Sequence, residues 1–133
     1  MSREAVKTTN APTPPPGLSQ AIKYNGMVYC SGNIGSDMEG KVISGGVKEE
    51  TVRTHCWTHG LFGESRLTVS ISLSQRRTLQ HLSAVLEASG SSLANVVKVN
   101  VFLTTMEDFA AMHEAYNEAF AHVDPKPVSP GAF

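Results

Sequence analysis

Apolar and polar residues alternate most clearly between residues 97 and 103, and this alternation predicts a β-strand. The apolar positions are Val97, Val99, Val101 and Leu103, and the positions between them are Lys98, Asn100 and Phe102. Successive side chains of a strand point to opposite faces of a sheet, so this pattern predicts one face that packs on a core.

Directly after this strand the apolar period lengthens to three or four residues, which predicts a helix. The recurring apolar residues are Phe109, Met112, Tyr116, Phe120 and Val123. This spacing places them on one helix face, and we interpret that face as part of the core. Thr105, followed by Asp108 three residues later, forms a variant of the capping box, so the helix is expected to begin at Thr105.

Two further elements are predicted in the earlier part of the chain. Asn25-Gly26 lies between two short apolar runs, and this dipeptide favours a type I′ turn, which predicts a hairpin over residues 21–31. A helix is expected from Arg76 to Gly90, because Gly commonly ends helices. Its apolar stripe consists of Leu79, Leu82, Val85 and Leu86.

Proline and glycine mark the irregular parts of the chain. Residues 1–16 end in Pro-Thr-Pro-Pro-Pro, which cannot enter a central strand, so they are expected to form an extended lead-in. Gly40, Gly45 and Gly46 indicate a loop between the hairpin and the helix.

The composition indicates one soluble, globular domain over residues 1–133. Hydrophobic residues make up 41% of the chain and charged residues 17%. The net charge of -1 offers no broad basic surface for nucleic acid, and no membrane span is predicted. Two cysteines are too few for a disulfide framework, so a reducing compartment is expected. The N-terminus lacks an apolar signal core, which favours the cytoplasm.

Three segments of this sequence resemble the RidA/YjgF family, which is also described as L-PSP endoribonuclease-like. They are GMVYCSGNIG at residues 26–35, HLSAVLEASGSSLANVVKV at residues 81–99, and NVVKVNVFLTTMEDFAAMHEAY at residues 95–116. The resemblance covers residues 16–50 and 76–127 in the family's order. It implies an α+β, chorismate-mutase-like fold, in which two helices pack on one face of a mixed sheet.

The resemblance also implies an activity. Family members are homotrimers that hydrolyse reactive 2-imino acids, 2-iminopropanoate and 2-iminobutanoate, to 2-oxo acids and ammonia, in clefts between subunits. It implies a small imine or enamine substrate and no metal or organic cofactor. Because the family has mitochondrial members, the mitochondrion is the alternative location. The alternative function is a non-catalytic, trimeric ligand-binding or regulatory module.

Imine hydrolysis needs a cation for the substrate carboxylate, polar groups that orient the imine, and a placed water. In the family, the cation is an arginine after Pro-Lys-Pro-Ala, and a glutamate on the last strand helps to place the water. This chain reads Val128-Ser129 after Pro127, and neither family residue is present. We therefore assign no catalytic residue, and whether the chain is an enzyme is left open.

Part of the family's pocket is present. Ser31, Gly32 and Asn33 occupy the positions of its Ser-Gly-Gln motif, where small residues let a ligand approach backbone N–H groups. We predict that they bind substrate, and a plain tight strand end is the alternative. Asn100 is predicted to line the same cleft, with packing against a neighbouring subunit as the alternative. Leu18 stands where many members have a tyrosine.

The chain departs from the family at residues 52–75 and 128–133. Residues 52–75 form an atypical insert, and their end, TVSISLS, alternates as a strand does. Codons for Val52-Arg53 and Val128-Ser129 can hold splice donors, and the codon for Gln75 can end in a splice acceptor. We therefore interpret both departures as retained intron sequence, which leaves the family's C-terminal strands missing.

His55, Cys56 and His59 are close enough in sequence to suggest a metal site, but we predict none. No helical pattern surrounds them, and no fourth ligand is placed to complete a tetrahedral site. Cys30 has alternating apolar neighbours and is expected in the core.

Overall fold

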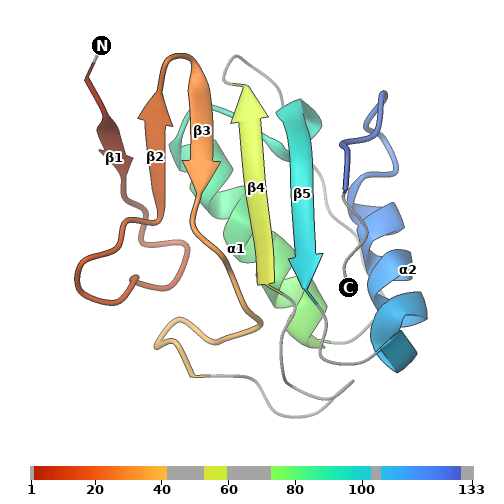
Figure 1. Ribbon diagram of the computed structural model, residues 1–133. Coiled ribbons are helices and arrows are strands. Elements are labelled where there is room, and N and C mark those ends of the chain that lie inside the picture. The colour runs from red at the N-terminus through yellow and green to blue at the C-terminus, as the bar shows by residue number, and fades with distance from the viewer. Residues whose placement is uncertain (1, 42–52, 60–72, 103–105, 130–133) are drawn as a thin grey trace.

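The computed structural model describes residues 2–41, 53–59, 73–102 and 106–129. Within these ranges the chain forms one five-stranded sheet and two α-helices (Figure 1). The elements are β1 (Glu4–Val6), β2 (Ala21–Tyr24), β3 (Met27–Cys30), β4 (Arg53–His59), α1 (Leu73–Ala88), β5 (Val96–Phe102) and α2 (Phe109–Ala119), with 3-10 turns at Leu93–Asn95 and Met106–Asp108. None of the described helices is long and apolar enough to cross a membrane.

The sheet has the order β1-β2-β3-β4-β5, and each of these neighbours is antiparallel. Helix α1 crosses one face of the sheet, and α2 lies beside β5 (Figure 1). Beyond β5 the sheet becomes mixed, because Val128 forms a parallel bridge with Lys98. The N–H of Val128 donates to Val97, and the N–H of Val99 donates to Val128, both at 2.9 Å. The α+β class expected from the sequence is confirmed.

The β2–β3 hairpin is confirmed with the predicted turn. Asn25 and Gly26 have φ values of 51° and 75°, so both residues of the connection adopt the positive φ that a type I′ turn requires. The lead-in also contains an element that was not predicted, because residues 4–6 pair with β2 as the edge strand β1. Its three residues precede the proline-rich stretch, which stays outside the sheet.

The core lies between the sheet and α1. All four residues of the predicted α1 stripe are buried, and Leu82 and Leu86 have no exposed surface. The helix ends at Ala88 and is closed, as predicted, by Gly90, whose φ is +80°. The N–H of Gly90 donates to Glu87 and the N–H of Ser91 donates to Leu86, which together form a Schellman motif.

Strand β5 agrees with the predicted alternation except at one position. Val99 and Val101 are buried as expected, whereas Val97 is 50% exposed. The register shifts between Trp57 and Thr58 of β4, so Thr58 pairs with Val96. This irregularity brings Val96 in place of Val97 to the buried side at the start of the strand.

Helix α2 begins later than predicted. A 3-10 turn occupies residues 106–108, and the α-helix starts at Phe109. Thr105 and the side chain of Asp108 lie outside the described residues, as does Leu103. Met112, Phe120 and Val123 are buried and Tyr116 is partly buried, so the core stripe is largely confirmed. Phe109 was predicted in the core but is 41% exposed, because it starts the helix and stacks on His113 at a centroid distance of 5.6 Å.

Two parts of the predicted insert belong to this fold. Residues 53–59 form β4, a strand that the sequence analysis did not predict, and it pairs with β3 on one side and β5 on the other. Helix α1 begins at Leu73, so the predicted strand TVSISLS is wrong at its end, and its first five residues lie outside the described ranges. Ser74 and Gln75 extend the amphipathic helix by less than one turn before Arg76.

Candidate functional site

The predicted substrate-binding residues Ser31, Gly32 and Asn33 follow β3 directly and form a tethered loop. The Ser31 N–H donates to the carbonyl of Gln20 at 2.9 Å, and the Ser31 hydroxyl donates to the carbonyl of Ser19. The Asn33 side-chain amide donates to the Ser31 carbonyl at 3.0 Å. Gly32 between them is exposed, so its backbone is open to a ligand. We call residues 31–36 the site loop.

Gln20 fixes the segment on which the site loop rests. Its side chain is buried and accepts a hydrogen bond from the Thr8 N–H at 2.8 Å. Its amide nitrogen donates to the carbonyls of Thr8, Ala11 and Pro12 at 3.1, 3.2 and 2.9 Å. One side chain therefore closes residues 8–12 into a fixed loop, while the Gln20 main chain holds Ser31.

Replacing Gln20 by leucine is expected to loosen this end of the molecule. The change removes four hydrogen bonds and leaves buried backbone groups without partners, so we expect about 2–4 kcal/mol of destabilisation. Urea denaturation of Gln20→Leu against Gln80→Leu provides the measurement, since Gln80 is exposed on α1. An equal effect of the two substitutions would contradict the proposed role of Gln20.

Asn100 lies at the level of the site loop but two strands away. It pairs with His55 of β4. Continuing the β3–β4 register by two residues brings Ser31 to the same position 55, so Ser31 and Asn100 are separated by two strand spacings, roughly 10 Å. Asn100 is partly buried, and its side-chain oxygen has no hydrogen-bond partner among the described residues. Strand β4 therefore lies between the two parts of the predicted site.

A cavity of about 680 Å³ lies beside Leu18, in the loop that Gln20 holds. It is lined by residues 6–9 and 13–20. Leu18 is 62% exposed, and the Gly17 φ of 89° permits the turn in which the Leu18 N–H donates to Pro15. The cavity adjoins Ser19 and Gln20, which hold the site loop, and so extends the candidate site toward the N-terminal segment.

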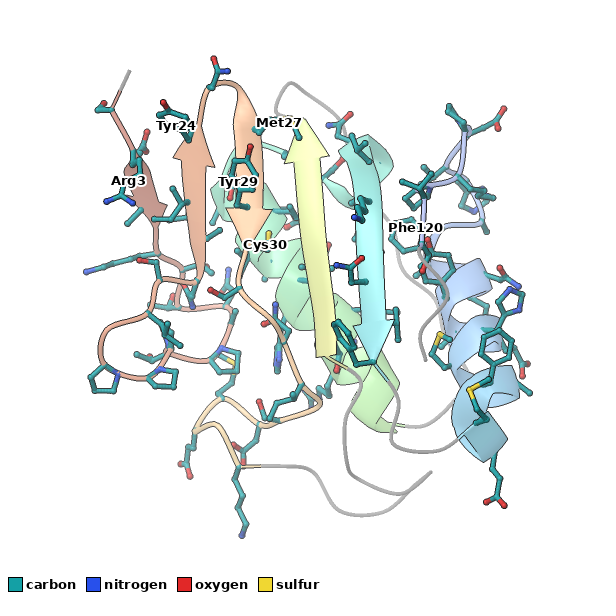
Figure 2. All side chains as sticks on the ribbon, in the orientation of Figure 1. Arg3, Tyr24, Met27, Tyr29, Cys30 and Phe120 are labelled. Carbon is teal, nitrogen blue, oxygen red and sulfur yellow. The ribbon has the colours of Figure 1, made fainter. Side chains whose placement is uncertain are left out.

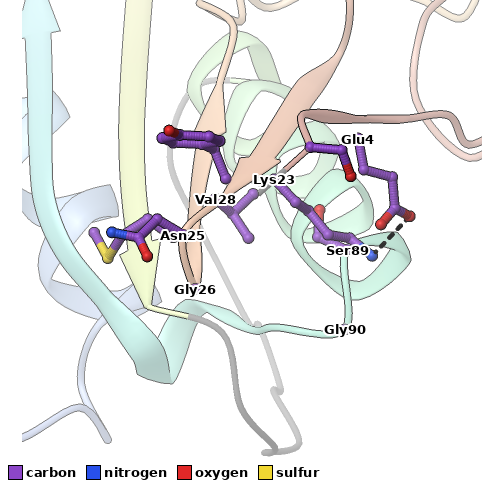
Figure 3. Close-up of a pocket in the computed structure, with 10 residues that line it drawn as sticks. Glu4, Lys23, Asn25, Gly26, Val28, Ser89 and Gly90 are labelled. Atoms are coloured by element: carbon purple, nitrogen blue, oxygen red, sulfur yellow. Dashed lines mark hydrogen bonds and ion pairs between the residues drawn. The ribbon is translucent and has the colours of Figure 1, made fainter.

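A second cavity, of about 300 Å³, lies at the end of the sheet where the β2–β3 turn meets the end of α1 (Figure 3). Lys23 and Glu4 form an ion pair there at 3.3 Å, and Ser89 and Gly90 also line the cavity. None of the predicted binding residues lines this cavity. Much of the ion pair is exposed to solvent, so it contributes little to stability.

Lys126 is the lysine nearest in sequence to the position of the family's arginine, and it already forms hydrogen bonds within this chain. Lys126 donates from its ammonium group to the carbonyl of Phe120, and to that of Ala121 at 3.1 Å. These carbonyls end α2, where a positive charge is favoured by the helix dipole. Lys126 therefore serves the end of α2 and is not available to hold a substrate carboxylate. The described residues contain no group of three or more His, Cys, Asp and Glu suited to a metal ion.

Sequence reasoning missed two buried polar residues of this region, and one of them, Gln20, supports the site loop. Gln20 and His81 are both polar and almost fully buried. Burial lowers the pKa of His81 below its usual value, the charge of Arg77 lowers it further, and the backbone of Ile34 opposes these effects. A histidine in the middle of an apolar helix stripe was the available signal, because a polar group there must serve some contact.

Comparisons with known proteins agree on one family. The endoribonuclease L-PSP family matches residues 62–130. A RutC family protein of Pyrococcus abyssi is 33% identical over 130 residues, which span 97% of this chain and 84% of that protein. The mouse 2-iminobutanoate/2-iminopropanoate deaminase is 30% identical over 119 residues, 89% of this chain and 70% of the relative.

Solved structures give the same answer for the fold. The crystal structure of yeast Mmf1 superposes with a TM-score of 0.73 at 29% identity, covering 98% of this chain and 86% of Mmf1. RidA from an Antarctic Psychrobacter superposes with a TM-score of 0.66 at 28% identity, covering 95% of this chain and 81% of RidA. The match in sequence and in fold extends over nearly the whole chain, and the chain therefore belongs to the endoribonuclease L-PSP family, which includes the RutC and RidA/YjgF proteins.

Proposed function

We propose that this protein binds small 2-imino acids and hydrolyses them slowly to 2-oxo acids and ammonia. The observation that carries the proposal is the site loop, which the Ser19 and Gln20 carbonyls hold with Gly32 exposed. The similarity to 2-iminobutanoate/2-iminopropanoate deaminases of mouse and rat supports this substrate class.

The roles follow from the groups available. The backbone N–H groups at Gly32 and Asn33 can donate to a substrate oxygen. A carboxylate without a guanidinium partner is held less firmly, so the reacting carbon is positioned less well. We therefore expect hydrolysis well below that of a relative with a complete site.

A non-catalytic ligand-binding or regulatory module is the second candidate, and the engagement of Lys126 with α2 favours it. Such a module needs only the donors that hold a 2-oxo acid. It does not need the groups that place and activate a water.

We also propose a homotrimer that closes the site between subunits. The face of the sheet away from α1 carries large apolar side chains, and Figure 2 shows Tyr24, Met27 and Tyr29 on it. Tyr24, Tyr29 and Phe102 are each between 41% and 46% exposed. A second copy covering this face would bury these side chains and complete the wall on which Asn100 lies.

The cytoplasm remains the proposed location, and the mitochondrion is the alternative. The mitochondrial alternative is supported by the mitochondrial protein mmf1 of Schizosaccharomyces pombe, which is 39% identical over 126 residues. The match covers 90% of this chain and 61% of mmf1.

Titration of the protein with 2-oxobutanoate tests the proposed site without requiring turnover. In ¹⁵N-resolved spectra, the backbone signals of Gly32 and Asn33 are expected to shift together. Butanoate, which lacks the 2-oxo group, is the matched control ligand and should shift them less. No shifts, or shifts confined to Glu4 and Lys23 at the second cavity, would contradict the proposed site.

A further inference from the structure

Two oppositely charged side chains lie on the face of the sheet that otherwise packs on α1. Glu4 pairs with Lys23 across β1 and β2, and Lys23 pairs with Val28 across β2 and β3. Residues that face each other in a ladder point to the same side of the sheet, and side chains two positions apart do so as well. Glu4 and Lys23 therefore share a face with Val28 and Ala21, which are buried in the core. Charged residues on such a face need a local reason, because charged side chains are rarely placed in a core.

The reason is that α1 ends before it covers this end of the sheet. The helix ends at Ala88, and Ser89 and Gly90 line the cavity of about 300 Å³ together with Glu4 and Lys23. Figure 3 shows the two charged side chains beside Ser89, where the helix has ended. The side chains proposed to contact a second copy lie on the opposite face of the sheet, so the charged side of this cavity stays open in the proposed homotrimer.

The charges of the cavity favour a ligand that carries both signs. The Lys23 ammonium and the Glu4 carboxylate are 3.3 Å apart, and their side chains are 35% and 67% exposed. Exposed ion pairs of this kind contribute little, so a ligand can separate them at small cost. A ligand with a single charge would pair with one of the two side chains and repel the other. A zwitterion replaces the one ion pair with two.

The backbone around the cavity adds to both charges. The carboxyl end of α1 carries partial negative charge, which assists Glu4 in attracting an ammonium group. Asn25 and Gly26 of the β2–β3 turn also line the cavity. Their N–H groups are not needed by the ladder, which closes with the pair of Tyr24 and Met27, so they can assist Lys23 in holding a carboxylate.

We propose that this cavity is a binding site for a free α-amino acid, with the ligand carboxylate on Lys23 and the ligand ammonium on Glu4. In an α-amino acid both groups are attached to one carbon atom, so their spacing suits two side chains that lie 3.3 Å apart. The volume lies at the lower end of the range of small-molecule sites, roughly 300–1,000 Å³, which favours a small ligand side chain. None of residues 31–36 lines the cavity, so the inference does not rest on the proposed function.

Titration of the whole chain with L-2-aminobutanoate tests this site. In ¹⁵N-resolved spectra, the backbone signals of Lys23, Gly26 and Gly90 are expected to shift together along one saturating curve, while those of Gly32 and Asn33 stay in place. Butanoate lacks the ammonium group and propylamine lacks the carboxylate. Each of these control ligands is expected to bind several-fold more weakly than the zwitterion.

Two charge-removing variants assign the ligand contacts. Lys23→Met and Glu4→Gln are each expected to weaken binding of L-2-aminobutanoate several-fold. Lys41→Met and Glu39→Gln are the matched controls and should bind as the wild type does, because both residues are exposed and neither lines the cavity. Since the ion pair contributes little to stability, all four variants should keep the thermal unfolding transition of the wild type.

The outcomes separate this site from the site loop. The inference is overturned if L-2-aminobutanoate causes no saturating shifts, if butanoate or propylamine binds equally well, or if the shifts appear at Gly32 and Asn33 instead of Gly90. Unchanged affinity in both Lys23→Met and Glu4→Gln would also overturn it. Should either variant fail to fold, the three ligands compared on the wild type decide. Binding of 2-oxobutanoate at the site loop is read from Gly32 and Asn33, so either proposal can fail while the other holds.

Discussion

Deletion of residues 52–75 is expected to abolish the cooperative unfolding transition of this chain. The segment includes all of β4, which pairs with both β3 and β5. Without it, β3 and β5 stand two strand spacings apart, roughly 10 Å, and each exposes an unpaired edge. The unfolding free energy of a small domain is only about 5–15 kcal/mol. The stability lost with a strand that has a neighbour on each side should exceed that free energy.

A point substitution tests the same claim more sharply. Cys56 lies inside β4 and pairs with Val99. Cys56→Pro removes one backbone N–H donor and leaves the acceptor of its hydrogen bond without a partner. This loss is expected to lower stability by about 1–3 kcal/mol before any steric clash is added. Ser2→Pro, outside the strands, is the control. Circular dichroism during heating should show a lowered or absent transition for Cys56→Pro alone, and equal transitions for both variants would contradict the role of β4.

The place of β4 in the sheet bears on the origin of residues 52–75. We maintain as a proposal that they are retained intron sequence, since their removal joins Thr51 to Arg76 and leaves a helix start rich in glutamate. The structure adds that the same residues fill the position between β3 and β5. A chain without them must place another strand there. Sequencing the gene and its mature transcript would test the proposal.

The elements that the sequence predicted well are those with local signals. The Asn25-Gly26 turn, the α1 stripe ending at Gly90 and the alternation around Val99 each depend on residues within a few positions of one another. Such signals determine a turn, a helix end or a buried strand face before any long-range contact forms.

The elements that were missed depend on distant partners. Strands β1 and β4 are short or lack a clear alternation, and each exists because a neighbouring strand supplies its hydrogen bonds. The start of α2 was misplaced because the capping pattern at Thr105 does not distinguish a 3-10 turn from an α-helix. Pairing partners of this kind cannot be read from local periodicity.

The candidate site also has a part that local sequence motifs predict and a part that depends on distant contacts. The motif resemblance located Ser31, Gly32 and Asn33 on one loop, and the structure gives that loop its attachments. Sequence patterns did not reveal that Gln20 supports the loop, because it acts through backbone groups of residues about ten positions away along the chain. They also gave no indication that β4 separates Asn100 from Ser31.

Ser129→Arg is expected to raise kcat/KM for 2-iminobutanoate hydrolysis by roughly 10- to 100-fold. The family resemblance places its carboxylate-binding arginine at this position, and Ser129 follows Val128, which pairs with β5 beside Val97 and Val99. A charge-assisted hydrogen bond contributes about 1.5–3 kcal/mol, and each 1.4 kcal/mol corresponds to a factor of ten. Ser129→Lys restores the charge without the planar fork and is expected to recover less.

The measurement that tests the account most directly is kcat/KM of the wild type, Ser129→Arg and Ser129→Lys in one coupled assay. A threonine dehydratase supplies 2-iminobutanoate, a scavenger competes for it, and formation of 2-oxobutanoate above the spontaneous rate is followed. The account predicts slow hydrolysis by the wild type, the largest gain for Ser129→Arg, and an intermediate value for Ser129→Lys. A wild type as fast as a relative with the arginine would contradict it, and so would a folded Ser129→Arg variant with no gain.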